Sequence, residues 1–178
     1  MASTLKVDIL QDSGGNNLVT SNGSGVITAA GFGKIGQVVQ AETTTETLNT
    51  ANSYATSTLS GTITPSSTSS KILVITSSSL RTFGDGTNSS GRNALAALFR
   101  GTVSGTKLQE HKVGLTDRSA STSNGTQAWN TVAFNYLDNP ATNSAQIYTV
   151  GMSGSGSCEI QAQQTGYKST MTLMEILP

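Results

Sequence analysis

The sequence predicts an all-β protein, and two observations support this prediction. The 25 Ser, 27 Thr and 19 Gly residues make up 40% of the 178 residues. Ser, Thr and Gly are poor helix formers, whereas Thr, Val, Ile and Tyr suit strands. In addition, short apolar alternations separated by Gly-, Asn- and Ser-rich turns recur at the spacing of a β-sandwich or barrel. The length suffices for one domain with a core, preceded by an arm.

The N-terminal segment, residues 1–33, is predicted to be an arm that attaches the chain to another protein. Its apolar pieces are short and are separated by two turn clusters, at 12–17 and 21–25. Pieces of this length cannot bury a face of their own, so we expect them to pack on a partner. The residues expected to dock are Leu5, Val7, Ile9, Leu18, Val26 and Ile27.

Residues 34–178 are predicted to form the β-sandwich domain. Its strands are expected near 35–40, 45–50, 54–64, 71–77, 94–101, 106–114, 128–136, 147–152, 158–163 and 169–177. The segment at 94–99 also suits a helical turn by composition, but its length and flanking glycines favour a strand. The apolar run at 71–76 predicts a central strand covered on both faces. Val132, Phe134 and Tyr136 share one face of their strand and are expected to enter the core.

Apolar residues occupy both faces of the last predicted strand. Met171 and Leu173 belong to one alternating set, and Met174 and Ile176 belong to the other. A sandwich strand with one solvated face would carry polar residues on that face. We therefore expect a second buried surface, for which a subunit interface is the simplest source. These four residues are predicted to form the interface of a homo-oligomer.

Several stretches resemble a known family. They read ITP at 63–65 followed by SSKILV at 69–74, NYLDNPAT at 135–142 and STMTLMEI at 169–176. In this order they resemble the small C-terminal domain of structural proteins of tailed bacteriophages, especially those that infect aquatic bacteria. The opening MASTLKVD at 1–8, with the Gly-rich turns after it, resembles the N-terminal attachment segment of phage fibre-like proteins.

The resemblance implies a trimeric β-sandwich of jelly-roll type, like the tumour-necrosis-factor domain, on the virion surface. It implies a non-enzymatic capsid decoration (cement) protein or head fibre, whose partner is the phage major capsid protein. The alternative is a short tail fibre, which would attach to a tail protein and bind a host surface glycan or outer-membrane protein. The number of subunits, three, comes from this resemblance.

The charge and the apolar pattern predict neither a nucleic-acid partner nor insertion into a membrane. Ten Lys and Arg balance ten Asp and Glu, so the chain has no net field to hold a polyanion. No apolar run approaches the roughly 20 residues of a membrane helix, and the N-terminus does not resemble a signal peptide. Cys158 has no partner for a disulfide within the chain and is expected to be a small buried residue.

No catalytic, cofactor-binding or metal-binding residue is predicted, and no enzymatic activity. The pattern G-x-G-x-x-G at 31–36 is followed by a strand pattern instead of the helix that a dinucleotide site needs. Gly31, Gly33 and Gly36 are instead predicted to form a hinge between arm and domain. His111, between Glu110 and Lys112, is expected to be a surface histidine.

Other chemical candidates have equally plain alternatives. The turn at 85–88 carries oxygen ligands but lacks the spacing of a calcium loop. The spacing of the carboxylates selects no pair suited to glycoside hydrolysis; these carboxylates are Glu42, Glu46, Glu110 and Asp117. Phe83 and Tyr167, near predicted loops, are candidates for stacking on a sugar, against the alternative of partial burial in the core.

Overall fold

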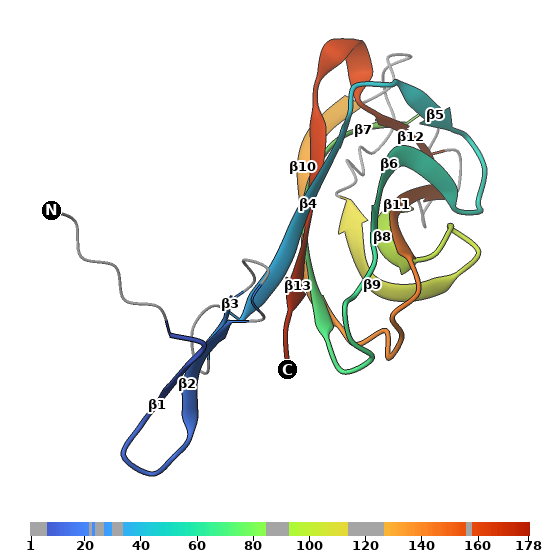
Figure 1. Cartoon of the computed structure of the whole chain (residues 1–178). Coiled ribbons are helices and arrows are strands. Elements are labelled where there is room, and N and C mark those ends of the chain that lie inside the picture. The colour runs from blue at the N-terminus through green and yellow to red at the C-terminus, as the bar shows by residue number, and fades with distance from the viewer. Residues whose placement is uncertain are drawn as a thin grey trace, which may run out of the picture.

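The computed structural model describes residues 7–21, 23, 27–29, 34–84, 93–113, 127–155 and 158–178 (Figure 1). The strands within these residues are β1 (Ile9–Gln11), β2 (Asn17–Ser21), β3 (Ile27–Ala29), β4 (Ile35–Thr43), β5 (Thr47–Asn49), β6 (Ala55–Ile63), β7 (Lys71–Gly84), β8 (Asn93–Arg100), β9 (Thr106–Val113), β10 (Gln127–Asp138), β11 (Gln146–Ser155), β12 (Cys158–Ala162) and β13 (Ser169–Ile176). A 3₁₀ turn, η1 (Gln164–Gly166), joins the last two strands.

The strand order is that of a jelly roll. One sheet contains β4, β13, β7 and β10 in this order. Beyond the end of β13, the C-terminal part of β7 pairs with the short strand β12, and β12 pairs with β5. The other sheet has the order β6, β11, β8, β9. Without β5 and β12, the sandwich has eight strands in two four-stranded sheets, and this order is that of a jelly roll built from two Greek keys. The fold class expected for residues 34–178 is therefore confirmed.

The core lies between the two sheets and follows the two-residue period of the strands. On β7, every even-numbered residue from Ile72 to Thr82 is buried, while the odd-numbered ones are exposed or half-buried. On β10, Val132 and Phe134 are buried and Tyr136 packs against the core, as expected. The Ala-rich segment forms strand β8 and not a helical turn. Both odd- and even-numbered residues of β8 are buried.

Each of the ten expected strands is present between residues 34 and 178, and the largest difference concerns β7. This strand is central, because it pairs with β10 on one side and with β13 and β12 on the other. The expectation that both its faces are covered does not hold within a single chain. Within the described chain the outward Ile75 is 36% exposed and Leu73 is half-buried, because a two-layer sandwich covers only one face of each sheet.

Before the sandwich, β1, β2 and β3 form a small antiparallel sheet of their own, here called the meander. Figure 1 shows it standing apart from the sandwich, on the side from which β4 departs. The predicted boundary between arm and domain, at residue 33, falls in a stretch outside the described residues.

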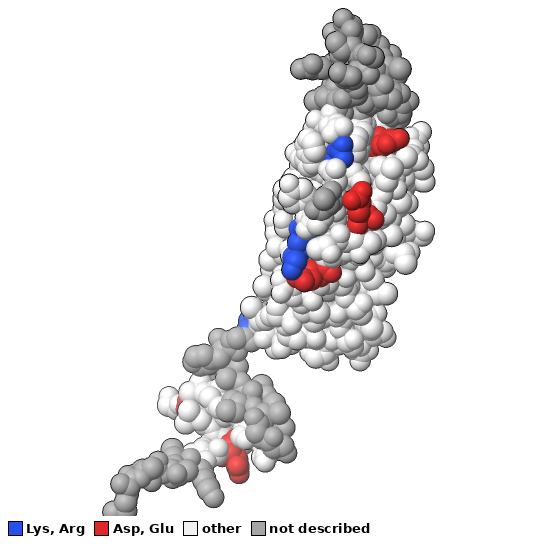
Figure 2. Space-filling view, turned by 90° about the horizontal axis from the view of Figure 1, so that it is seen from above, with Lys and Arg blue, Asp and Glu red and all other residues white. Residues whose placement is uncertain are grey.

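The visible surface carries little charge. Figure 2 shows a few Lys, Arg, Asp and Glu side chains scattered over a largely uncharged face, several of them beside a side chain of opposite sign. In the described chain no helix is long and apolar enough to span a membrane.

Candidate functional site

The meander presents apolar side chains to solvent. A hairpin turn shapes its first two strands: the Asp12 carboxylate accepts hydrogen bonds from the backbone N–H groups of Gly14 and Asn16 at 2.8 and 2.9 Å. The Asn16 side chain also donates to Asp12, and these bonds lower the pKa of the Asp12 carboxyl. On the strands beside this turn, Ile9, Leu10 and Leu18 are more than a third exposed, and so is Val7, which precedes β1.

The predicted docking residues are thus only partly placed. Ile9 pairs with Thr20 and Leu10 pairs with Val19, while Leu18 lies where the register of the two strands shifts. Ile27 lies in β3, whereas Leu5 and Val26 lie outside the described residues. The segment is also more ordered than a single extended arm, because its backbone hydrogen bonds are made between its own strands.

Of the predicted hinge, Gly31 and Gly33 lie outside the described residues, and the prediction for Gly36 is wrong. Gly36 lies inside β4, where β4 has a bulge opposite β13. A Cβ at this position would stand 2.8 Å from the Leu177 side chain and 3.0 Å from the Glu175 carboxylate. A side chain here would require Leu177 and Glu175 to shift, and the backbone of Gly36 is held by the pairing of β4 with β13 on either side of the bulge.

The structure separates the four predicted interface residues of β13 into two pairs. Met171 and Leu173 are fully buried in the core of the chain itself, so they have no surface to offer to a partner. The prediction for these two residues is corrected: they are core residues. Met174 and Ile176 point to the outer face of the sheet and are half-buried, so an interface role for them stays a prediction.

Met174 belongs to an apolar row that crosses four strands. By register, Met174 pairs with Val38 on one side and with Leu73 on the other, and Leu73 pairs with Leu137 of β10. Val38 is 57% exposed and Leu137 is 50% exposed, while Ile75 continues the apolar surface on β7. Only Met174 of this row is predicted from the sequence as an interface residue. The alternation of apolar and polar residues along one strand does not show which distant strands pair with it.

Glu175, on the inner face of β13, is a buried carboxylate that clamps the turn before β7. Its Oε1 accepts hydrogen bonds from the backbone N–H and the hydroxyl of Ser66, both at 2.6 Å. Its Oε2 accepts one from Gln37 Nε2 at 2.8 Å. Burial acts to raise the pKa of the Glu175 carboxyl, but the hydrogen bonds outweigh it and hold this pKa at about 2.

A second buried carboxylate, Asp138, joins the two sheets. It accepts a hydrogen bond from the Tyr148 hydroxyl at 2.7 Å, and both its oxygens lie 3.1 Å from Arg100 Nη1. Burial, followed by the hydrogen bond to Asp138, raises the pKa of the Tyr148 phenol. The stretch at 135–142, one of those that carry the family resemblance, therefore contains a structural tie between sheets.

The remaining titratable candidates lie on different elements. His111 is half-buried instead of exposed, because it points inward and stacks on Phe134 with 5.1 Å between ring centroids. Cys158 is buried, as expected. Among the residues that the structure describes, no three His, Cys, Asp or Glu side chains gather as metal ligands would. The turn at 85–88 and Asp117 lie outside those residues.

The three other carboxylates singled out from the sequence each contact a partner of their own. Glu42 on β4 pairs with Lys168 at 2.9 Å, and Glu46 accepts a hydrogen bond from Gln161. Glu110 on β9 contacts Lys107 and the Tyr54 hydroxyl, and these hydrogen bonds lower the pKa of its carboxyl.

No family model matches the chain, and neither does any curated protein. Among solved structures it is similar to VP2 of infectious bursal disease virus. The alignment with a mutant VP2 in T=1 particles has 10% sequence identity and a TM-score of 0.35, and it covers 99% of this chain and 44% of the VP2 chain. The alignment with VP2 in a subviral particle has 12% sequence identity and a TM-score of 0.34, and it covers 80% of this chain and 38% of the VP2 chain. The chain thus spans less than half of these VP2 chains. A likeness at this level carries no argument about function.

Proposed function

We propose that the chain is a non-enzymatic structural protein of a bacteriophage virion, a capsid decoration (cement) protein or head fibre at the virion surface. One observation carries the proposal. The outer face of the jelly roll presents the apolar row Val38, Met174, Leu73 and Leu137 to solvent. An exposed apolar patch that crosses a whole sheet is typical of a surface that another protein covers.

The apolar row supports self-association. No charged side chain lies within it. The row on one side, Gln40, Thr172, Ile75 and Asn135, is also uncharged, whereas the row on the other side contains Lys71 beside Ile176. Copies of one nearly neutral chain can therefore bring the apolar row and the uncharged row together without burying an unpaired charge. In the proposed assembly the copies form a homotrimer, the number that the family resemblance implies, with Met174 and Ile176 in the interface.

The meander supports attachment to a second protein, for which we propose the phage major capsid protein. Its Ile9, Leu10 and Leu18 are exposed, and β1 and β3 are the edges of a three-stranded sheet. Such edges offer backbone groups for strand addition, and the alternating side chains fit pockets on the partner. Several meanders on one oligomer bind together, so contacts that are individually weak give strong retention.

The alternative is a short tail fibre that attaches through the meander to a tail protein. It would bind a host surface glycan or an outer-membrane protein. One observation favours it, an exposed pocket with two aromatic side chains on the outer sheet face, formed by Trp129 and Tyr167.

Quantifying the chain in purified particles of its source virus tests the proposal. A copy number similar to that of the major capsid protein is expected for a decoration protein. A far smaller number, matching the tail proteins, would support the alternative. Absence of the chain from washed particles would contradict both.

A further inference from the structure

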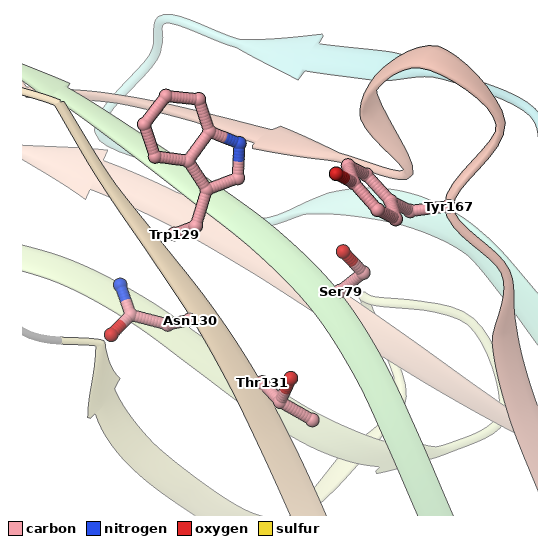
Figure 3. Close-up of a pocket in the computed structure, with 5 residues that line it drawn as sticks. All are labelled: Ser79, Trp129, Asn130, Thr131 and Tyr167. Atoms are coloured by element: carbon pink, nitrogen blue, oxygen red, sulfur yellow. The ribbon is translucent and has the colours of Figure 1, made fainter.

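A shallow pocket of about 330 Å³ lies on the outer face of the sheet, at the end of β7 and β10 that is farther from the apolar row. Its lining residues are Ser79, Trp129, Asn130, Thr131 and Tyr167. Figure 3 shows Trp129, Thr131, Ser79 and Tyr167 on one side of β10, with Ser79 next to Tyr167, and Asn130 on the other side. The volume falls at the lower end of the range for small-molecule pockets.

The two aromatic side chains of this pocket lie in solvent. Trp129 is 57% exposed and Tyr167 is 59% exposed. Trp129 is also the only tryptophan of the chain. Large aromatic rings supply much of the burial energy of a core, so an exposed pair beside a pocket indicates a surface used for binding. The alternation that buries Val132 and Phe134 also points Trp129 outward, a signal that the sequence analysis does not use.

The indole of Trp129 is held in one orientation before any ligand arrives. Its Nε1–H donates a hydrogen bond to Gln164 Oε1 at 3.1 Å. On the neighbouring strand, the guanidinium of Arg81 lies 5.1 Å from the Trp129 ring centroid and 3.7 Å from that of Phe83. A ring fixed in this way loses little conformational freedom on binding, which favours affinity.

The turn that carries Tyr167 is anchored to the core. Gln163, which precedes η1, is fully buried and adopts a left-handed backbone with φ of 52°. Its side chain lies 2.8 Å from Ser169 Oγ. With the amide oriented to satisfy both its ends, the nitrogen donates to the carbonyls of Ser57 and Thr45 at 2.8 and 3.1 Å. Both walls of the pocket therefore stand on rigid supports.

Between these walls the pocket offers hydroxyl groups. Among the described residues, the hydroxyls of Ser79 and Thr131 make no hydrogen bond to protein, so they can bind a polar ligand. No carboxylate lines the pocket. An aromatic platform beside hydroxyl donors and acceptors matches a pyranose ring, which has an apolar face of C–H groups and a rim of hydroxyls.

We propose that this pocket binds a carbohydrate, with the C–H face of a pyranose on Trp129, its rim bonded to Ser79 and Thr131, and Tyr167 as the second wall. The inference goes beyond the proposed capsid role, and in the alternative, a tail fibre, it identifies the residues that would bind the host glycan. A shallow pocket with one stacking ring predicts weak binding per site, which the copies on one oligomer would raise.

Because Trp129 is the only tryptophan, the indole N–H resonance in NMR spectra of the full chain reports this site alone. The probes are oligosaccharides of glucose, galactose, mannose and N-acetylglucosamine, each titrated to about 10 mM. This concentration lies above a Kd of about 1 mM, which corresponds to roughly 4 kcal/mol of binding free energy. We expect at least one probe to shift the resonance saturably.

Variants of the pocket residues then test whether the sugar binds in this pocket. The affinity of each variant for the sugar is measured by saturation-transfer NMR. Trp129→Ala is expected to weaken binding at least about tenfold, and Tyr167→Ala about threefold. Ile147→Ala is the matched control, because Ile147 is an exposed apolar residue on β11 of the other sheet, outside both the pocket and the apolar row, and it should bind as the wild type does. Thermal unfolding checks that each variant folds.

Three results would overturn the carbohydrate site: no probe shifts the indole resonance, Trp129→Ala binds as well as the wild type, or Trp129→Ala lowers the sedimenting mass of the oligomer. The last result would mean that a second copy of the chain covers the pocket. None of these measurements involves a virion, so their failure is distinct from failure of the proposed function.

Discussion

Glu175 is a charged group held inside the sandwich by neutral donors. Its partners come from the turn after β6 and from β4, so one carboxylate connects segments far apart in sequence. Hydrogen bonds to an ionised group are about twice as strong as those between neutral groups. The same carboxylate stands close to the position of a Cβ at Gly36, which links the glycine and the acid in one packing arrangement.

This arrangement predicts a pH dependence of stability. The pKa of the Glu175 carboxyl is about 2 in the folded chain, against 4.5 ordinarily. Because folding lowers this pKa, the contribution of the carboxylate is complete above about pH 4.5 and is lost as the pH falls towards 2. A shift of this size corresponds to about 3 kcal/mol. We expect Glu175→Gln to lower the free energy of unfolding at pH 7 by about that amount, measured by denaturant titration.

The matched control is Glu42→Gln, since Glu42 is an exposed carboxylate on β4 whose pair with Lys168 lies in solvent. A surface pair of this kind contributes about 0 to 1 kcal/mol. The difference between wild type and Glu175→Gln should shrink as the pH falls from 4.5 to 2. If both variants have the same stability as the wild type at pH 7, the clamp at Glu175 is not a stabilising feature.

At the scale of the element, one face of β13 packs into the core and the other face lies on the outer surface of the sheet. Leu173 fills the core, whereas its neighbour Met174 lies on the outer face in the apolar row. We expect Leu173→Glu to unfold the chain, because a charge would be buried without a partner. Met174→Glu should leave the chain folded and abolish its self-association, as measured by sedimentation velocity and circular dichroism.

Val38→Glu repeats this test from the other end of the row, at a site more than half exposed in the single chain. Thr170→Glu is the control on the outer face of the same strand, outside the apolar row. Folded oligomers of unchanged mass for both Met174→Glu and Val38→Glu would place the interface elsewhere. A wild type that stays monomeric at micromolar concentration would rule out the homotrimer.

The elements of the sandwich could be predicted from local alternation, but their pairing could not. The two-residue period of β10 correctly assigns Val132 and Phe134 to the core, because it depends only on neighbours in sequence. The apolar row depends on register between residues as far apart in sequence as Val38 and Met174, which no local pattern encodes. Gly36 was misjudged for the same reason: the side chains that exclude a Cβ come from the far end of the chain.

At the scale of the whole molecule, the described strands of the meander and those of the sandwich belong to separate hydrogen-bonded sheets. Strands β1, β2 and β3 pair with one another and complete a sheet of their own. We expect that deleting residues 1–30 leaves the thermal transition of the sandwich unchanged, because no strand of its two sheets loses a partner. The truncated chain should no longer stay bound to virus particles that lack the wild-type protein, as measured by co-sedimentation.

A full-length variant, Val7→Asp with Ile9→Asp, serves as the companion test, since both side chains are exposed on the meander. It should reproduce the loss of retention without shortening the chain. Retention of the truncated chain at wild-type occupancy would contradict attachment through the meander. Unfolding of the truncated chain would show instead that residues 1–30 are part of the folding unit.

The direction of the strands also determines how the molecule bears mechanical load. Strand β4 begins beside the row of Lys71, and the aromatic pocket lies at the row of Arg81, ten residues further along β7 and roughly 30 Å away. A pull between these ends runs parallel to the strands. Hydrogen bonds between antiparallel strands are perpendicular to that direction. All the hydrogen bonds between β4 and β13 are therefore loaded together in shear, instead of breaking one pair at a time. A chain held at one end and pulled from the other is loaded in the direction in which a sheet resists most.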